Sequence, residues 1–360
     1  MKRVCLVGVS PNDKGGVARA MLYLAFIYRM LGYNVVWLEI QRANFSTLST
    51  CDIIHVNVPL RFKNLWLILL RKPRKILTLH GLILDEARSS LYLSHTILEK
   101  LKALVGYINI SIHWIAHKFI LIPLIYDYVT AVAYIKVKKN NVRAIVIPNP
   151  ITCKMISGHG EKSLTPHSIE VIFGTYVGAG GWIEVLLGLV RIVRVIYLIN
   201  RRLKELSNKQ QVILHVYGDV PPILLEALSK YSFVKFIGYL ERSEFIKRLS
   251  TADLFIERFP LPELRYITLE AMCVGIPVAK FSMDPESEEM VDGFNGILAT
   301  SDEEMVEKLT KYILNMDEMK RALATNAKNT IVKNRDPKYI AVMWRTVVNE
   351  LISRKDKRYM

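Results

Sequence analysis

Four segments between Val234 and Leu298 decide the fold: VKFIGYL at 234–240, TADLFIERF at 251–259, LEAMCVGIPVAKF at 269–281 and EEMVDGFNGIL at 288–298. Three short apolar runs in this stretch predict buried strands: Val234–Ile237, Leu254–Ile256 and Val278–Lys280. Helical patterns at Ser243–Ser250 and Ile267–Val274 separate these runs. Strands that alternate with helices indicate βαβ units, and therefore a parallel sheet.

The same alternation extends through the rest of the chain. Further strands are predicted at Val4–Val9, Asn34–Ile40, Ile53–Val58, Ile76–Leu79, Tyr128–Ala133, Ala144–Ile147, Glu170–Phe173 and Val212–Tyr217. Further helices are predicted at Ile183–Leu206, Pro222–Ser229, Glu303–Asn315 and Met319–Lys333. The polar stretch Ser157–His167 has the composition of a linker.

The length of 360 residues fits two domains. We expect an N-terminal domain over residues 1–155 and a second domain over 156–335. A helix within 336–360 is expected to pack back on the N-terminal domain. Both domains would be doubly wound α/β folds, whose ligands bind at the carboxyl ends of the strands. A cleft between those ends is the expected active site.

Composition excludes several classes of protein. Hydrophobic residues make up 51% of the chain, which excludes a disordered protein. The most apolar stretch, Gly106–Tyr126, contains two histidines, Lys118 and Pro123, so it does not predict a membrane-spanning helix. The N-terminus runs directly into a strand, so no signal peptide and a cytoplasmic location are expected. Gln occurs only at positions 41, 210 and 211, which weakly indicates a thermophile.

The four cysteines, Cys5, Cys51, Cys153 and Cys273, form no CxxC motif and no cluster with histidine. This spacing argues against a disulfide framework and against a structural zinc site. It fits a reducing compartment.

In order, spacing and residue type, the four segments resemble the C-terminal domain of family-four glycosyltransferases, which have the GT-B fold. Three N-terminal motifs resemble the same family: Gly15-Gly16-Val17, Thr78-Leu79-His80-Gly81 and Val146-Ile147-Pro148-Asn149. The resemblance implies two Rossmann-like domains that face a central cleft. It also implies transfer of a sugar from a nucleotide diphosphate sugar with retention of configuration, without a metal or cofactor. The chain contains no Asp-x-Asp motif, which suits the metal-independent mode.

The resemblance assigns donor-binding roles around one predicted helix. Glu270 would hold the nucleotide ribose, since a carboxylate accepts hydrogen bonds from both hydroxyls. Arg265, Thr268 and Leu269 lie in the opening of the same helix, whose N–H groups would face the diphosphate. Glu288 matches a family glutamate near the sugar ring. The family carries another glutamate where this chain has Pro262, so the neighbouring Glu263 either takes its catalytic place or is an ordinary acidic residue of the first turn.

The chain departs from the family after the strand that ends near Gly174. The family places two cations in this loop, where the chain has Thr175 and a run with Gly178 and Gly180. Backbone N–H groups of the glycine-rich loop would cradle phosphate, or the loop is a plain turn between strand and helix. Arg258, Arg265 or Lys280 would replace the missing charge.

In the N-terminal half, Gly15 and Gly16 would let the backbone approach the donor phosphate or the acceptor closely, or they form a plain turn. His80 matches a family histidine that contacts the transferred sugar, which makes it a catalytic candidate, although a lone histidine at the end of a strand is often structural. His55 has no support beyond its position.

The net charge of +16 predicts an anionic partner. Basic residues cluster with apolar ones around Leu65–Leu70, within Lys100–Pro123 and within Val190–Lys204. These are either solvated faces of crossover helices or surfaces that dock on an anionic membrane. Nucleic acid ranks lowest, because no recognised nucleic-acid module accompanies the charge.

Together these patterns predict a metal-independent glycosyltransferase that acts on a lipid-linked or polysaccharide acceptor at the inner face of the cell membrane. The alternative is a GT-B-shaped protein that binds a glycan or a partner without catalysis. The two missing cations favour that alternative, whereas Glu270, Glu288 and His80 favour the enzyme.

Overall fold

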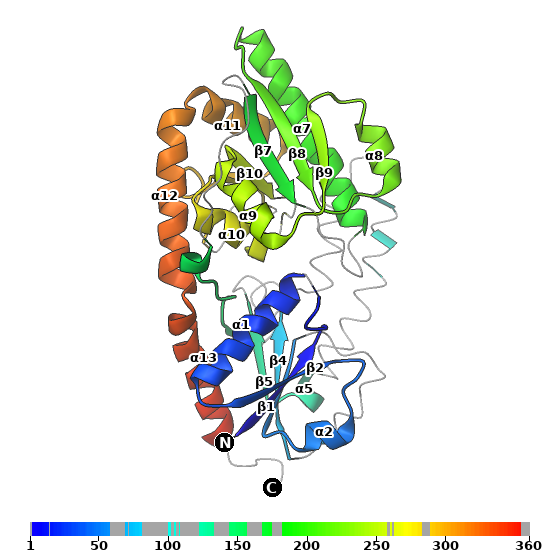
Figure 1. The fold of residues 1–360 in the computed structure, drawn as a ribbon, viewed down its shortest axis with the longest axis vertical. Helices are drawn as coiled ribbons and strands as arrows, with labels where there is room; N and C mark the ends of the chain where they lie inside the picture. Colours follow the sequence, from blue (N-terminus) through cyan, green and yellow to red (C-terminus); the bar gives the residue numbers. More distant parts are fainter. Residues whose placement is uncertain are drawn as a thin grey trace. The chain divides into compact units, whose positions relative to one another are not determined.

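The computed structural model describes residues 2–13, 15–57, 69–70, 72–80, 100–101, 104–105, 108, 122–132, 144–156, 168–174, 182–257, 260, 263–282 and 289–353. These residues form two compact units (Figure 1). The first unit draws on Met1–Leu84, Tyr107–Ile151 and Arg335–Met360, and the second on Asp85–Gly106 and Thr152–Asn334.

The first unit is built on a parallel sheet of six short, apolar strands. They are β1 (Arg3–Gly8), β2 (Asn34–Glu39), β3 (Ile53–Val56), β4 (Arg74–Leu79), β5 (Tyr128–Ala131) and β6 (Ile145–Val146). Their order across the sheet is β2-β1-β3-β4-β5-β6, and every pairing is parallel. Each of these strands was predicted to within two residues, because each is a short, mostly apolar run in the sequence.

Helices cover both faces of this sheet. On one face, α1 (Gly16–Met30) and α13 (Pro337–Ser353) lie side by side (Figure 1) and share a core with β1, in which Trp344 is fully buried. The other face carries α2 (Phe45–Ser49) and α5 (Ile122–Ile125), whose Leu48 and Ile125 pack beneath the strands. Helix α13 therefore completes the core of the first unit, although it follows the second unit in the sequence.

A buried row of polar side chains crosses the first sheet. Nδ1 of His55 lies 3.0 Å from the Tyr28 hydroxyl, and its Nε2 lies 2.6 Å from Oγ1 of Thr78. Oγ1 of Thr78 in turn lies 2.7 Å from Oγ1 of Thr130. His55 is thus a core residue within β3. Burial, with a smaller contribution from His80, lowers its pKa to about 3, so its imidazole is neutral.

The second unit has its own six-stranded parallel sheet. Its strands are β7 (Ser168–Gly174), β8 (Gln211–Tyr217), β9 (Val234–Gly238), β10 (Leu254–Glu257), β11 (Val278–Phe281) and β12 (Ile297–Ala299). The order β12-β11-β10-β7-β8-β9 is that of the Rossmann fold. Five of these strands were predicted, and the short edge strand β12 was not.

Helices on both sides of the second sheet surround its strands, and a short 3-10 helix leads into the unit. The helices are α7 (Trp182–Glu205), α8 (Pro222–Leu228), α9 (Arg242–Thr251), α10 (Tyr266–Val274), α11 (Asp302–Leu314) and α12 (Met316–Arg335), and the 3-10 helix is η3 (Cys153–Met155). Residues of α7, α8, α11 and α12 share the main hydrophobic core on one face of the sheet. Helices α9 and α10 pack against each other, and α10 contacts β10 and β11.

The prediction that the cysteines form no disulfides was wrong. Cys5 in β1 is bonded to Cys51, which directly precedes β3, and Cys153 in η3 is bonded to Cys273 in α10. The partners are 46 and 120 residues apart, and the fold brings their Cα atoms to within 6.0 Å and 5.0 Å. Sequence spacing cannot reveal such pairs. Disulfides also occur inside cells of hyperthermophiles, so the pairing does not decide the compartment.

Several cations of the predicted basic clusters serve the fold. The Lys75 ammonium is buried and donates to the backbone oxygen of Leu70 at 2.5 Å. The Arg191 guanidinium is buried against Asp302 at 2.5 Å and lies over the Phe281 ring. Most of Leu65–Leu70 and of Lys100–Pro123 lies outside the described residues. Within the described part of the chain, no helix combines the length and apolar character needed to cross a bilayer.

Candidate active site

The second sheet has a strand-order reversal between β7 and β10. In open parallel sheets, ligands bind beyond the carboxyl ends of the strands at such a point. There β7 ends at Gly174, and β10 ends at Glu257, whose register partner in β11 is Lys280. Glu257 and Lys280 are both buried. Buried charged side chains are uncommon unless they are paired.

Helix α10 begins at this edge, as predicted. Arg265 is its N-cap residue, and Gly275 ends the helix in the left-handed conformation with a φ of 81°. The N–H of Leu269 already donates to the Arg265 oxygen at 2.9 Å, so Leu269 closes the first turn and its N–H is not available to a ligand. The N–H groups of the three helical residues before it have no intrahelical acceptor, because they open the helix. They make the helix N-terminus a site for an anion.

Buried polar contacts hold this end of α10 to the sheet. Oγ1 of Thr268 donates to the Glu257 carboxylate in a short hydrogen bond. Nζ of Lys280 donates to the backbone oxygen of Glu263 at 2.9 Å, which anchors the segment that leads into the helix. Thr268 therefore positions the helix through its side chain, and any contact that it makes to a donor would come from its backbone.

Glu270, the predicted ribose-binding residue, is fully buried in the second turn of α10. Nε of Arg242, the first residue of α9, donates to its Oε1 at 2.8 Å. The Arg242 side chain is 51% exposed, so its guanidinium lies between the buried carboxylate and solvent. Sequence analysis missed Arg242 because 28 residues separate it from Glu270 and no motif links the two.

Gly174 leaves no room for a side chain where β7 meets α10. A Cβ at this position would lie 2.2 Å from Cδ1 of Ile267, the second residue of α10. A larger residue at this position would require the Ile267 side chain to move, so the first turn of α10 packs against the end of β7.

The first unit has a corresponding edge, where the strand order reverses between β1 and β3. Asn57 directly follows β3, and its Oδ1 lies 3.0 Å from Nε2 of His80, which directly follows β4. The two polar side chains meet because their strands are neighbours. Asn57 is a second residue that sequence analysis missed, and its only signal was its position after a buried strand.

Gly15 and Gly16 lie at the start of α1. Gly15 is the N-cap residue of the helix, and its N–H donates to Oδ1 of Asp13 at 2.6 Å. Its φ of −77° is open to any residue, so the backbone conformation does not itself require glycine.

The structure brings Glu263, Arg265, Thr268, Leu269 and Glu270 together at the N-terminal end of α10. The other predicted donor-binding residues, Gly178, Gly180, Arg258 and Glu288, lie outside the described residues. Within the described part of the chain, no three His, Cys, Asp or Glu side chains are grouped to hold a metal ion.

Comparison with known proteins identifies the fold and the family that this chain resembles. Residues 186–315 match the family model of group 1 glycosyl transferases, and this range contains all four segments that carried the resemblance. That resemblance is therefore confirmed. No curated protein sequence matches the chain.

Several solved structures have the same fold over nearly the whole chain. HepE of Anabaena in complex with UDP-glucose has a TM-score of 0.66 at 16% identity, over 97% of this chain and 100% of that chain. Sucrose-phosphate synthase of Thermosynechococcus elongatus has a TM-score of 0.69 at 13% identity, over 99% and 100%. A glycosyltransferase of Rickettsia africae has a TM-score of 0.65 at 14% identity, over 98% and 100%. The predicted GT-B fold is confirmed.

Proposed function

We propose that the protein transfers a sugar from a nucleotide diphosphate sugar to a glycan or lipid-linked acceptor, because residues 186–315 match the family model of the group 1 glycosyltransferases. The observation that carries the proposal is the position of α10. Its N-terminal end lies at the strand-order reversal of a Rossmann sheet, within the segment that matches the family. Glu270 in the same helix is the carboxylate for the nucleotide ribose.

The chemistry requires stabilisation of a leaving diphosphate. When the bond between the sugar C1 and the diphosphate breaks, negative charge gathers on the phosphate oxygens. The backbone N–H groups at the start of α10 face that charge, and the side chains of Arg265 and Arg242 add two cations. These cations take the place of the two that the family carries in the loop after β7.

The proposal includes the finer features that the resemblance implies. Transfer proceeds with retention of configuration, and it needs neither a metal ion nor a cofactor. His80, oriented by Asn57, contacts the transferred sugar, and Glu263 and Glu288 contribute carboxylates to the sugar site. Support comes from the His80–Asn57 contact and from the position of Glu263 in the segment that leads into α10.

We propose that the enzyme acts at the inner face of the cell membrane, and the exposed face of α1 supports this proposal. Leu22, Phe26 and Met30 are large apolar side chains on the exposed face of this helix, spaced at i, i+4 and i+8. The helix contains two arginines and no acidic residue. An apolar stripe with cationic flanks suits an anionic lipid surface, from which a lipid-linked acceptor would be reached.

Donor binding tests the proposal directly. UDP, GDP and ADP, each paired with its nucleoside, would be titrated into the parent protein and into Glu270→Ala. A hydrogen bond to a charged group is worth about 1.5–3 kcal/mol, so Glu270→Ala should weaken the preferred nucleotide and its nucleoside about 10- to 100-fold. Arg242→Gln should weaken the diphosphate more than the nucleoside, because its cation serves the phosphates.

Lys247→Gln is the matched control, since Lys247 is an exposed cation of the same helix α9 whose partner is Glu244. It should leave both affinities unchanged. The proposed function would be refuted if no nucleotide bound the parent protein, or if Glu270→Ala bound the preferred nucleotide as the parent does.

A further inference from the structure

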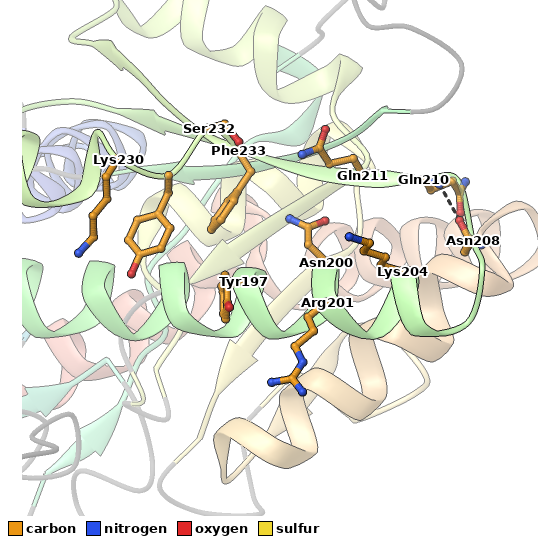
Figure 2. A pocket seen from close by; sticks show the side chains of 11 residues that line it. Tyr197, Asn200, Arg201, Lys204, Asn208, Gln210, Gln211, Lys230, Ser232 and Phe233 are labelled. Atoms are coloured by element: carbon orange, nitrogen blue, oxygen red, sulfur yellow. Dashed lines mark hydrogen bonds between the residues drawn. The ribbon is translucent and has the colours of Figure 1, made fainter.

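A pocket of about 570 Å³ opens at the opposite edge of the second sheet, where β8 begins and just before β9. Figure 2 shows its two walls. One wall is the last part of α7, with Tyr197 and Lys204, and the other is the chain around Lys230 and Ser232. Gln210 and Gln211 close it at the start of β8. None of these residues takes part in the proposed donor site.

The pocket and the donor site are separated by the length of a strand. The pocket lies at Gln211, where β8 begins, and the donor edge lies beyond Tyr217, where β8 ends. At about 3.3 Å per residue, a seven-residue parallel strand spans roughly 20 Å. A ligand in the pocket therefore leaves the donor edge open.

Aromatic rings form one side of the pocket. The Tyr197 side chain is 48% exposed, and its ring centroid lies 6.3 Å from that of Tyr231. The Tyr231 ring rests in turn on Phe233, with centroids 5.4 Å apart. Supported aromatic rings with one open side offer flat apolar surface at low cost in conformational entropy. The C–H faces of sugar rings stack on such surfaces.

Two cations in the pocket have no acidic partner. Among the described residues, neither Lys204 nor Lys230 forms an ion pair, and the Lys230 ammonium lies 5.3 Å from the Tyr231 ring centroid. The neighbouring Arg201 differs, because its Nε donates to Glu205 at 3.1 Å. In Figure 2, Arg201 extends from the other side of the helix. The positive charge available to a ligand in this pocket therefore comes from two lysines on opposite walls.

The amide side chains divide into structural and available groups. The Asn200 side chain accepts from the N–H of Val212 at 2.8 Å and donates to its backbone oxygen at 3.0 Å. Asn208 accepts from the N–H of Gln210 at 2.7 Å. These bonds fix the walls. Gln211 lines the pocket, and an amide side chain can both donate to and accept from hydroxyl groups.

We propose that this pocket binds an anionic oligosaccharide, the chain of an acceptor glycan that carries carboxylate, sulfate or phosphate groups. This inference rests on the proposed glycosyltransferase function. The pocket would hold the glycan chain while the end of that chain is extended elsewhere on the protein. Rings, amides and two opposed cations together suit a short acidic sugar segment. A single-stranded nucleic acid would need a longer cationic groove along its phosphates.

The test measures binding alone, with the full chain. Tetragalacturonate is the anionic probe and maltotetraose the neutral one, each titrated by calorimetry at low and at moderate salt. We expect tetragalacturonate to bind at least tenfold tighter than maltotetraose, and its affinity to fall as salt rises. A Lys204→Gln/Lys230→Gln variant should lose at least tenfold in affinity for tetragalacturonate. Tyr197→Ala should lose about fivefold, and Tyr197→Phe should bind as the parent does.

The matched control is Lys328→Gln/Lys333→Gln, which removes two exposed lysines from α12. It should bind tetragalacturonate within twofold of the parent. The inference is overturned if tetragalacturonate does not bind at millimolar concentration, or if the variant without Lys204 and Lys230 binds as the parent does. Tighter binding of a tetranucleotide through the same two lysines would also overturn it, in favour of nucleic acid.

Nucleotide binding by the same variants separates this inference from the proposed function. The variant without Lys204 and Lys230 should bind the preferred nucleoside diphosphate as the parent does. Loss of oligosaccharide binding with intact nucleotide binding would place the effect in the pocket alone. Oligosaccharide binding in a protein that binds no nucleotide would refute the proposed function and leave the pocket assignment standing.

Discussion

Removal of the Cys153–Cys273 disulfide should destabilise the second unit strongly. Cys153→Ala is the preferred change, because Cys153 is half-buried in η3 whereas Cys273 is fully buried in α10. The bond closes a loop of 120 residues. By the chain-entropy relation, such a loop contributes about 5 kcal/mol to the free energy of unfolding. Measured losses are about 2–5 kcal/mol, a large share of the roughly 5–15 kcal/mol typical of a domain.

Hydrogen exchange read by mass spectrometry is the suitable assay, because it reports each unit separately and does not assume two-state unfolding. Under oxidising conditions, the core strands β7 and β8 of Cys153→Ala should lose about 2–5 kcal/mol of protection, whereas strands of the first unit should be unchanged. With a reductant present, the variant and the parent should show the same protection in the second unit.

Cys51→Ala is the matched control in the first unit. Its bond to Cys5 closes a loop of 46 residues, which predicts about 4 kcal/mol in that unit only. A loss below about 1 kcal/mol in Cys153→Ala, with no free thiol in the oxidised parent, would refute the estimate. Four titratable thiols in the oxidised parent would show that the bonds do not form.

Two further predictions concern pH and lipid. The pKa of His55 is about 3 in the folded protein and about 6.5 when unfolded, so the unfolded chain binds the extra proton. The His55 contribution to the free energy of unfolding should therefore fall by about 1.4 kcal/mol for each pH unit between about pH 6.5 and pH 3. Urea unfolding should show a steeper loss of stability in this range for the parent than for His55→Asn, and equal slopes would contradict the prediction. In vesicle sedimentation, the parent protein should bind anionic but not neutral lipid. Phe26→Ser should weaken this binding, and the control Thr346→Ser, at an exposed position of α13, should leave it unchanged. Equal, negligible binding of the parent to both lipids at low salt would contradict the membrane assignment.

The strands were predictable from sequence because each of them is a short, mostly apolar run. The exception, β12, has three residues and follows a turn in which Gly293 has a φ of 72°. Its length alone did not hide it, because β6 has only two residues and was predicted. Its place beside β11 is decided by tertiary contacts.

The disulfides were not predictable, and the reason is geometric. Cys5 lies within β1 and Cys51 lies just before the neighbouring strand β3, so their proximity follows only from the strand order. Cys153 meets Cys273 because the segment that enters the second unit crosses α10. Each pair depends on topology, which local sequence patterns do not encode.

The sequence motif predicted the features of α10 itself but not the cation that binds its carboxylate. The motif identified α10, its start at Arg265 and its carboxylate Glu270, because these are local features of one helix. The sequence suggested Arg258, Arg265 or Lys280 as replacements for the two cations that the family carries in the loop after β7. All three lie near α10 in the sequence. Lys280 proves to be buried, and its ammonium holds the backbone oxygen of Glu263.

Arg242 comes instead from α9, which the strand order places next to α10. Its half-exposed guanidinium binds a fully buried carboxylate, an arrangement that costs desolvation energy without an evident gain in stability. A ligand that shares the pair would supply that gain, since the hydroxyls of a ribose can bond to the carboxylate and a phosphate to the guanidinium. The separate effects of Arg242→Gln on diphosphate and nucleoside binding therefore test whether this contact exists for the donor or only for the fold.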